Sequence, residues 1–506
     1  MDRALSDPQG ATTGPSCYET SFVARLPRTP DYVGIADAAM NHLVEDQRPD
    51  GSWGPSLAPP PYRLVPTLAA TAATALRQDQ DARHVTSARE GLAWLSAHAE
   101  EFPPERLPDT GGLEIIVAAL LEDLDTLTVG QDAALLHGVH RLAQVHAPAR
   151  HRLERLRGAM RSGHPLPPYA DHFLEVLVSP ADTPRSGARW GALLAQGAVA
   201  CSPAATATLL RAHGGPVPAA TAYLVSNARD MGGAQPGFRP IPAFELAWIT
   251  RDVLRTGSVL PGTAADRMRR ALRRSVTPDG VAVGPGAPAD GDTTATTLAA
   301  LRLLGADVDT TPLDRFEDVD AFATFYLGES GPSVTTNAHA LEALTGPTPS
   351  AQTRRQRHKA TEYLLDSQES GGLWTDRWHA SPYYATACAM TALSLCAPKR
   401  PTPRIKASVD AMLREQRPDG SWGIWGPTLD ETAHAAGALI ATAVDHRHHD
   451  RRQAVSRAAA FLTDALHAHA DDAVNTPLWH GKELYQPIQV VRALSVAVTE
   501  RAARPG

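Results

Sequence analysis

An octapeptide that occurs twice in identical form constrains the fold of this chain more than any other feature. The segment from Gln47 to Gly54 reads QRPDGSWG, and the segment from Gln416 to Gly423 repeats it letter for letter. Each copy follows an amphipathic segment and precedes a proline-containing turn and an alanine-rich segment. Chance does not readily produce identity over this length, so the chain is predicted to contain two related halves.

Weaker turns of the same kind divide the second half into units of similar length. Their glycines, Gly280, Gly328, Gly372 and Gly420, are 48, 44 and 48 residues apart, and a helical apolar run follows each turn. A unit of two helices and a glycine turn exposes an apolar face, which it buries by stacking on its neighbours or by closing into a ring. With four such units and no capping pattern, we predict closure into an α/α barrel.

The first half repeats this pattern less regularly, and the sequence contains no long alternating pattern typical of β-strands. We therefore predict an all-α protein with two α/α-barrel domains, at residues 30–240 and 241–506. An N-terminal segment, residues 1–29, is expected to associate with the second domain.

Composition and charge argue against several classes of protein. The 506 residues carry a net charge of -7, whereas nucleic-acid-binding domains usually carry a basic surplus. The four cysteines are scattered without a CxxC pair, which indicates reduced thiols rather than a disulfide framework or a zinc site. No apolar run reaches the roughly 18 residues that span a bilayer, and the segment from Met1 to Ser16 is polar. We expect a cytoplasmic protein, monomeric or homodimeric, without a membrane span or a nucleic-acid partner.

Two carboxylates precede a helical run in the second half. The segment Asp290-Gly291-Asp292-Thr293-Thr294 leads into a run rich in alanine and leucine. Asp and Thr are ordinary helix N-caps, so a structural role is the simplest interpretation of this pattern in isolation. If both acids are buried, like charge and desolvation favour the protonated form of one of them. Such a carboxylic acid is able to donate a proton at neutral pH.

The repeat places other side chains beside these acids. Asp292 lies 12 residues after Gly280, and offsets of 9, 11 and 11 residues lead from the next three turns to Asn337, Tyr383 and Glu431. Equivalent offsets predict that all four residues lie near the N-termini of successive inner helices, at one mouth of one barrel.

Aromatic residues are concentrated in the same part of the chain, although they form only 6% of it. Trp374, Trp378, Tyr383 and Tyr384 fall between two of these turns. Core packing is the ordinary role of such residues, but aromatic faces also stabilise cations. An acid beside aromatic faces in a dry pocket is suited to the protonation of an alkene.

Taken together, these motifs resemble those of the bacterial class II terpene cyclases with two domains, named β and γ. The octapeptides resemble the Gln/Trp turns of that superfamily, and Asp290 to Thr294 occupies the place of its DxDD acid motif. The segment from Asp376 to Tyr384 resembles its DKWHxSPYY segment. Three further segments match: Ser202 to Ala207, Phe244 to Trp248 and Leu478 to Tyr485. The resemblance covers nearly the whole chain and implies a γ barrel at 30–240, a β barrel at 241–506, and an active site between them.

The resemblance also implies a reaction and a set of roles. These enzymes protonate a polyisoprenoid and close rings through a series of carbocations. By position, Asp292 is the general acid, Asp290 tunes and orients it, and Asn337 hydrogen-bonds its other face. The aromatic residues implied to line the cation path are Trp248, Trp378, Tyr383 and Tyr384.

One departure from the family pattern bears on the substrate. The last aspartate of the family motif is Thr293 here. The resulting DxDTT motif resembles that of bacterial drimenyl diphosphate synthases, so cyclisation of farnesyl diphosphate to drimenyl diphosphate is predicted. The alternative within the class is conversion of geranylgeranyl diphosphate to a copalyl-type diphosphate. Squalene–hopene-type cyclisation and a non-catalytic α/α-barrel binding protein are further alternatives.

The diphosphate end of the substrate is expected to meet the first domain. Glu114 and Glu122 resemble the acidic Mg²⁺ segment of the diphosphate-using members, so Mg²⁺ is the expected cofactor and Glu114 the better candidate ligand. One or two carboxylates plus substrate phosphates are the usual environment of Mg²⁺. Lys482, one of only four lysines, and Arg377 are candidates for diphosphate binding. A surface lysine is the alternative for Lys482. The sequence lacks a DDxxD-type cluster, so the diphosphate is expected to stay in the product.

Overall fold

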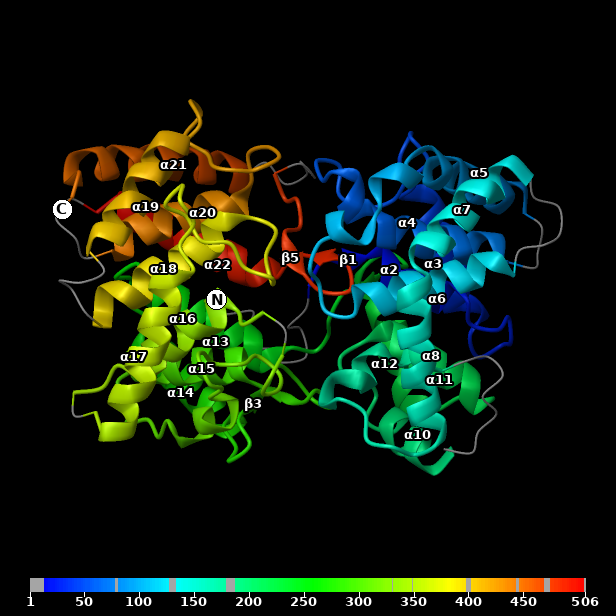
Figure 1. The fold of residues 1–506 in the computed structure, drawn as a ribbon, viewed down its shortest axis with the longest axis horizontal. Coiled ribbons are helices and arrows are strands. Elements are labelled where there is room, and N and C mark those ends of the chain that lie inside the picture. Colours follow the sequence, from blue (N-terminus) through cyan, green and yellow to red (C-terminus); the bar gives the residue numbers. More distant parts are fainter. Residues whose placement is uncertain are drawn as a thin grey trace.

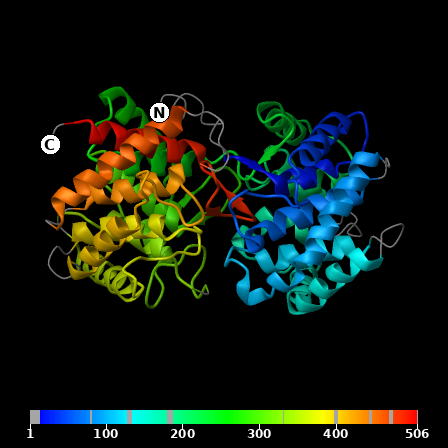
Figure 2. The same ribbon diagram turned by 90° about the horizontal axis from the view of Figure 1, so that it is seen from above.

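The glycine turns separate a long series of helices, which form two lobes lying side by side (Figures 1 and 2). The computed structural model describes residues 13–77, 81–126, 133–178, 187–329, 331–347, 349–396, 402–442, 446–467 and 474–504. The helices of the first lobe are α2 (Cys17–Ala24), α3 (Val33–Glu45), α4 (Pro60–Ala75), α5 (Ala82–Ala97), α6 (Leu113–Asp125), α7 (Ala133–Val145), α8 (Ala147–Arg161), α9 (Leu174–Leu177), α10 (Gly187–Leu194), α11 (Pro203–His213) and α12 (Pro218–Asp230). The helices of the second lobe are α13 (Pro242–Arg255), α14 (Gly262–Ser275), α15 (Gly291–Leu303), α16 (Val334–Ala343), α17 (Ala351–Asp366), α18 (Pro382–Cys396), α19 (Thr402–Glu415), α20 (Leu429–Ala441), α21 (His448–His467) and α22 (Ile488–Ala502).

Short elements complete the described part of the chain. The 3-10 helices are η1 (Ala99–Glu101), η2 (Pro104–Arg106), η3 (Pro168–Phe173) and η4 (Thr311–Phe316). Three antiparallel two-residue ladders pair β1 (Pro15–Ser16) with β2 (Gln235–Pro236), β3 (Val281–Ala282) with β4 (Ala289–Asp290), and β5 (Trp479–His480) with β6 (Leu484–Tyr485).

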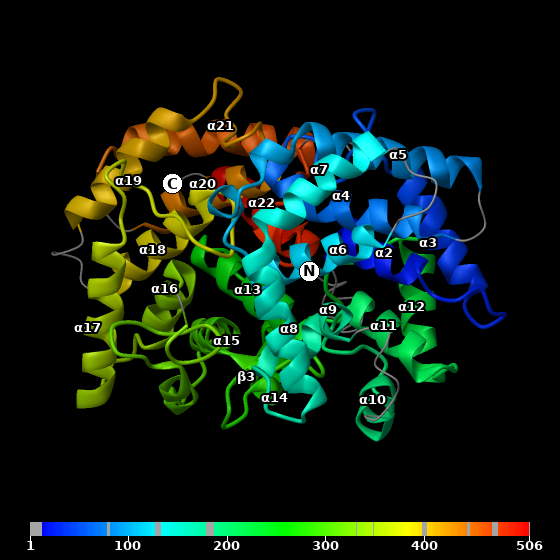
Figure 3. The ribbon, with the colours of Figure 1, turned by 45° about the vertical axis from the view of Figure 1, so that its right-hand side comes forward.

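Six inner helices of the second lobe close into a ring. In order round the ring they are α13, α15, α16, α18, α20 and α22, and α22 packs back on α13. The outer helices α14, α17, α19 and α21 cover this ring, and Figure 3 shows α17 and α21 along its rim. The inner helices are buried almost throughout because their alanines, threonines and leucines face helices on both sides. A ring of this kind buries the apolar faces of all its units without a capping repeat.

The first lobe is built in the same way from shorter helices. Its inner ring runs α2, α4, α6, α9 and α11, and α11 packs back on α2. Two hydrophobic clusters fill this lobe, from Tyr18 to Ala228, and one large cluster fills the other, from Cys201 to Val498. The prediction of an all-α fold with α/α barrels is therefore confirmed, while the exact domain boundaries stay a prediction.

The two octapeptides form the same turn in the two lobes. Gln47 Nε2 donates to Gly51 O at 2.9 Å, and Gln416 Nε2 donates to Gly420 O at 2.9 Å. The indoles of Trp53 and Trp422 donate to carbonyls of the preceding helix, at 2.7 Å and 2.9 Å. Both turns therefore tie the end of an outer helix to the start of the next inner helix.

Glycine is required in both turns by conformation and by space. Gly51 and Gly420 have φ values of +87° and +89°, which L side chains rarely adopt. A Cβ at these positions would lie 2.6 Å from Glu90 O and 2.5 Å from Arg457 O. The turn thus lets the backbone of a neighbouring outer helix approach closely.

The segment at residues 1–29 contacts both lobes in its described part. Gly14 N donates to Gln486 O of the second lobe at 3.0 Å. Helix α2, however, packs on α3, α4 and α11, and its Tyr18, Phe22 and Val23 lie in the clusters of the first lobe. The predicted association with the second domain therefore does not extend to α2, because the apolar side chains of this helix are buried in the first.

Candidate active site

The acid motif lies where the β3–β4 hairpin runs into helix α15. Asp290 caps the helix, since its Oδ1 accepts from Thr293 N at 2.7 Å. Burial raises the pKa of Asp290 to about 7, although the hydrogen bonds from Thr293 oppose the shift. The backbone N–H of Gly291 donates to Thr324 O at 2.7 Å. The motif is therefore held by its own helix cap and by the segment that precedes α16.

Asp292 is paired with an imidazole that the sequence analysis did not single out. Its Oδ1 lies 2.6 Å from Nδ1 of His339, which projects from α16. The Asp292 side chain is 14% exposed, whereas His339 is fully buried. Burial opposes a charge on His339, but the nearby Asp292 carboxylate outweighs it and raises the imidazole pKa to about 10. Nε2 of the same ring lies 3.4 Å from Cys388 Sγ, so both ring nitrogens have partners.

Asn337 does not make the contact predicted for it. Its Oδ1 accepts from Phe322 N at 2.8 Å, and its Nδ2 donates to Phe322 O at 3.1 Å and to Ser333 O at 2.8 Å. These bonds use the amide, and among the described residues no hydrogen bond joins it to Asp292. Two residues along a helix rotate the side chain by about 200°, so Asn337 and His339 leave α16 in different directions. Asn337 instead holds the backbone of Phe322. The same segment contains Thr324, whose carbonyl accepts the hydrogen bond from Gly291 N.

A network of buried charges lies one turn further along α16. Glu342 is fully buried and accepts from Arg251 Nε at 3.1 Å and from Arg255 Nε at 2.8 Å. Arg251 also pairs with Asp252 at 2.6 Å. Burial would raise the pKa of Glu342, but the two guanidinium groups lower it to about 2. Each buried charge near His339 is therefore paired with an opposite charge on α13 or α16.

Four aromatic side chains, Phe244, Trp248, Tyr384 and Trp479, form a continuous surface that we call the aromatic wall. Trp248 Nε1 donates to Tyr384 Oη at 2.7 Å. Ring centroids lie 4.1 Å apart for Phe244 and Trp248, and 4.5 Å apart for Tyr384 and Trp479. Trp248 also meets the ring of His339 edge-on at 5.5 Å. Trp248 thus lies against His339, the partner of the acid, and Tyr384 lies next to Trp248, while the role of both residues in facing a cation stays a prediction.

The other two predicted aromatic residues lie elsewhere. Tyr383 Oη donates to Glu415 Oε2 at 3.0 Å, at the end of the outer helix α19. Successive helix residues differ by about 100° in direction, so Tyr383 cannot share the face of Tyr384. Trp378 lies where the lobes meet, 5.6 Å from the ring of Phe325 and in reach of Gly111.

Lys482 is buried between the lobes and is already neutralised. Its Nζ lies 2.9 Å from Glu19 Oε1 and 2.8 Å from Glu175 Oε1, and it donates to Ser202 Oγ at 2.7 Å. The lysine side chain is only 3% exposed. The prediction that Lys482 binds diphosphate is therefore not supported, because two carboxylates of the first lobe hold its ammonium group. We call this group of four residues the interlobe ion cluster.

Arg377 lies at the surface where the lobes meet. It donates to Gly331 O at 3.0 Å, and its guanidinium lies 3.3 Å from Asp109 Oδ1 of the first lobe. The guanidinium carbon also lies 5.3 Å from the ring centroid of Trp378. Its predicted role in diphosphate binding stays a prediction.

The two predicted metal ligands lie on the first lobe, on α6. Glu114 is ion-paired with Arg152, and Glu122 is paired with Arg150 at 3.0 Å and Arg157 at 2.7 Å. Eight residues of helix separate the two glutamates, about 12 Å along its axis, so they cannot share one ion. Within the described residues, no group of three His, Cys, Asp or Glu side chains is arranged to hold a metal. Both glutamates are therefore paired with arginines in this structure, and their role as Mg²⁺ ligands stays a prediction.

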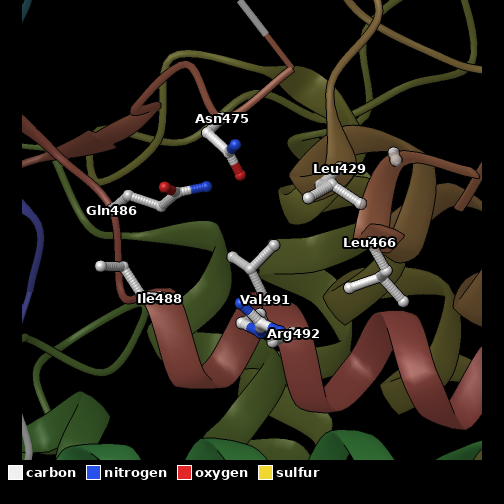
Figure 4. Close-up of a pocket in the computed structure, with 8 residues that line it drawn as sticks. Leu429, Leu466, Asn475, Gln486, Ile488, Val491 and Arg492 are labelled. Atoms are coloured by element: carbon white, nitrogen blue, oxygen red, sulfur yellow. The ribbon is translucent and has the colours of Figure 1, made fainter. Parts of the chain in front are cut away.

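A small cavity of about 70 Å³ opens between α20, α21 and α22 (Figure 4). Leu429, Asn475, Gln486 and Arg492 are among its lining residues. None of the predicted site residues lines it, and a ligand pocket usually measures about 300 Å³ or more. This cavity is therefore not the candidate site, which the contacts described above place around Asp292, His339 and the aromatic wall.

Comparison with known proteins agrees with this geometry. A family model described as "Squalene-hopene cyclase C-terminal domain" matches residues 322–443. The chain is 35% identical over 518 residues to an ent-copalyl diphosphate synthase of Streptomyces sp. strain KO-3988, covering 99% of this chain and 95% of the relative. It is 33% identical to a copalyl diphosphate synthase of Streptomyces cyslabdanicus, covering 99% and 94% of the two chains.

The fold comparison gives the same result. The solved ent-copalyl diphosphate synthase from Streptomyces platensis superposes with a TM-score of 0.82 at 30% identity, covering 99% of this chain and 98% of that one. In the described part of the chain, no helix is both long and apolar enough to cross a membrane. On the evidence of its acid motif, its paired barrels and these full-length relatives, the chain belongs to the class II terpene cyclases.

Proposed function

We propose that this chain cyclises geranylgeranyl diphosphate to a bicyclic copalyl-type diphosphate. The observation that carries the proposal is the Asp292–His339 pair at the mouth of a closed helical ring, beside the aromatic wall. An acid with a cationic hydrogen-bond donor on one oxygen, next to aromatic faces, is suited to protonate an alkene and to hold the cation that results.

In this proposal, the Asp292 carboxylate of the resting pair takes up a proton on Oδ2 before turnover and donates it to the alkene, while His339 donates its Nδ1–H to Oδ1. A hydrogen bond from an imidazolium stabilises the carboxylate that remains after proton transfer. The acid is therefore strongest at the moment at which the alkene takes the proton. His339 is fully buried, so water does not weaken this interaction.

The aromatic wall serves the next stage. The rings of Trp248 and Tyr384 are buried and held by their mutual hydrogen bond, so their faces are fixed before the substrate arrives. A carbocation that moves along the substrate lies against the π faces of these rings rather than against lone pairs. The rings therefore stabilise the carbocation without reacting with it. Mg²⁺ remains an expectation from the resemblance, as a counter-ion of the substrate diphosphate.

The choice of substrate differs from the one that the DxDTT motif suggested. Thr293 is buried, and its N–H contacts Asp290, so it belongs to the helix cap. In this location the side chain of Thr293 does not select between substrates of different length. Relatives that span this chain bear the name copalyl diphosphate synthase, and copalyl diphosphate is a C20 compound. These observations favour geranylgeranyl diphosphate over farnesyl diphosphate.

A product assay tests the proposal. The purified chain is given geranylgeranyl and farnesyl diphosphate separately, and the products are dephosphorylated and identified by mass spectrometry. A bicyclic C20 alcohol is expected, and Asp292→Asn should lower its formation by about 10³-fold or more while substrate still binds. Asp279→Asn, at an exposed aspartate of the same lobe, is the matched control.

Three outcomes would contradict the proposal in different ways. A bicyclic product from farnesyl diphosphate alone would restore the drimenyl interpretation. Turnover near the wild-type rate in Asp292→Asn would remove Asp292 as the acid. Binding of both diphosphates without any product would favour a non-catalytic binding protein.

A further inference from the structure

A second buried acid–imidazole pair lies across the ring from Asp292. Asp430 is the second residue of α20, as Asp292 is the second residue of α15. Three steps round the ring separate α15 from α20 in either direction, so the two helices stand on opposite sides. His434 follows one turn after Asp430 on the same helix face.

Both carboxylate oxygens of Asp430 have buried hydrogen-bond donors as partners. Its Oδ1 lies 2.8 Å from His434 Nδ1, and its Oδ2 accepts from Trp479 Nε1 at 2.8 Å. Burial alone would raise the pKa of Asp430, but His434 and His379 outweigh it and hold that pKa below its usual range. Asp430 is therefore a carboxylate, and it orients the imidazole of His434.

The hydrogen bond to Asp430 determines which nitrogen of His434 carries a lone pair. With its hydrogen on Nδ1, the neutral ring presents Nε2 as an acceptor. This Nε2 is buried and has no hydrogen-bond partner among the residues that the structure describes. The His434 ring meets that of Tyr384 edge-on at 4.9 Å and lies 6.3 Å from Trp479. It therefore borders the same aromatic wall that reaches His339 on the acid side.

The neighbouring His379 differs in its contacts. Its Nδ1 accepts from Ser381 N at 3.0 Å and lies 3.1 Å from Ser381 O. Its Nε2 is also buried without a hydrogen-bond partner among the described residues, but it is directed toward Asp430 Oδ1 at 3.5 Å. His379 therefore faces the Asp430 carboxylate, whereas Nε2 of His434 lies on the side of its ring away from Asp430.

We propose that His434, oriented by Asp430, is the base that ends the cyclisation. A C–H bond next to the final tertiary cation breaks, its electron pair forms the new C=C bond, and the proton passes to Nε2 of His434. The imidazolium that forms is ion-paired with Asp430. One proton leaves Asp292 and one arrives at His434, so the reaction remains an isomerisation. This assignment rests on the function proposed above.

The location of the base matters more than its strength in such a step. A C–H bond beside a tertiary carbocation is acidic enough that any lone pair within reach removes the proton. The aromatic wall offers π faces, so one imidazole nitrogen at its far end selects the hydrogen that is lost. The position of the alkene in the product then follows from the position of Nε2.

The variant His434→Asn tests the assignment because Asn Nδ2 retains a donor toward Asp430 but lacks Nε2. Geranylgeranyl diphosphate should still be consumed at a rate within about tenfold of the wild type, because protonation by Asp292 is untouched. The main olefin should fall by about tenfold as a share of product, replaced by hydroxylated bicyclic diphosphate and isomeric olefins. His172→Asn is the matched control, since His172 also has a buried Nε2 without a described partner but lies in the first lobe.

The remaining outcomes decide between this assignment and the function it rests on. An unchanged product distribution in His434→Asn, or a changed one in His172→Asn instead, overturns the assignment while the cyclase function stands. Absence of any bicyclic product from the wild type overturns both. If His434→Asn does not fold, Asp430→Asn serves instead, with the same shift in products expected and an unchanged distribution again overturning the assignment.

The pH dependence of the product distribution separates a base from a structural residue. Burial lowers the pKa of His434, but Asp430 outweighs it, and the net shift is upward. The charged and titratable groups around the ring are Asp430, His379, Tyr384 and, further away, Asp252. Because the pKa is raised, the neutral ring with a lone pair on Nε2 becomes more populated as the pH rises, so raising the pH from neutral should lower the hydroxylated share in the wild type but not in His434→Asn. The same pH dependence in both proteins would overturn the assignment.

Discussion

Replacing Asp292 with Asn should remove a pH-dependent part of the stability of the protein. His339 has a folded-state pKa of about 10, against an ordinary value of 6.5, because the Asp292 carboxylate outweighs burial. A histidine whose folded pKa is raised stabilises the folded state fully below the unfolded pKa, and this contribution is lost as the pH rises through the folded pKa. The window is therefore about pH 6.5 to 10.

The size of the effect follows from the shift. A difference of about 3.5 units, at about 1.4 kcal/mol per unit, corresponds to about 5 kcal/mol below the window and about 4 kcal/mol at pH 7. Little of it remains at pH 10. Because His339 is fully buried, no discount for solvent screening applies. For a unit the size of one lobe or of the whole chain, 4 kcal/mol corresponds to about 4–7 °C in Tm.

Thermal unfolding at pH 7 and pH 10 measures this contribution. Asp292→Asn should be less stable than the wild type at pH 7, and the gap in Tm should shrink by about 4–7 °C at pH 10. Asp279→Asn, which removes an exposed carboxylate, should show no such change between the two pH values. A gap for Asp292→Asn that is equal at both pH values would refute the charged pair.

Three further predictions concern other parts of the structure. Lys482→Met leaves two buried glutamates unneutralised and should cost about 3–5 kcal/mol in thermal unfolding, whereas the exposed Lys406→Met should cost close to nothing. Asn337→Leu removes the bonds to the Phe322 backbone, and it should lower kcat with little change in KM and reduce stability by about 1–3 kcal/mol; a change in KM alone would contradict a positioning role. Glu114→Gln should raise the Mg²⁺ concentration needed for half-maximal turnover, and an unchanged requirement would remove Glu114 from the site.

The fold was predictable because the repeated turn is a local structure. Gln416 bonds to Gly420 within the same octapeptide, and Trp422 bonds to the helix just before it. A weaker copy at Gln368 keeps the same contacts: Gln368 bonds to Gly372 at 2.8 Å and Trp374 Nε1 to Leu364 O at 2.7 Å. Contacts that span four to ten residues leave a signature in the sequence, and their spacing then gives the repeat.

The partners of the site residues could not be predicted in the same way. The offset from a turn locates the start of an inner helix, but it does not give the direction of each side chain. The offset therefore indicates Asn337, although His339 makes the contact; the signal for His339 in the sequence is a lone histidine in an alanine-rich inner helix. The spacing and the resemblance both indicate Asp292, whereas only the resemblance indicates Tyr384; the spacing indicates Tyr383, which lies on another face of α18.

The interlobe ion cluster has a consequence for how the chain can be divided. Glu19 and Glu175 belong to the first half of the chain, and the single ammonium group that pairs with both of them is contributed by Lys482, close to the C-terminus. Expressed alone, a fragment ending near residue 240 would enclose two carboxylates with no counter-charge from the hairpin that supplies it. The other fragment, from about residue 241 onward, would expose the ammonium group of Lys482, because Glu19 and Glu175 would be absent. The two barrels each have a core of their own, yet autonomous expression of either should yield poorly soluble material, and co-expression of both fragments should restore it.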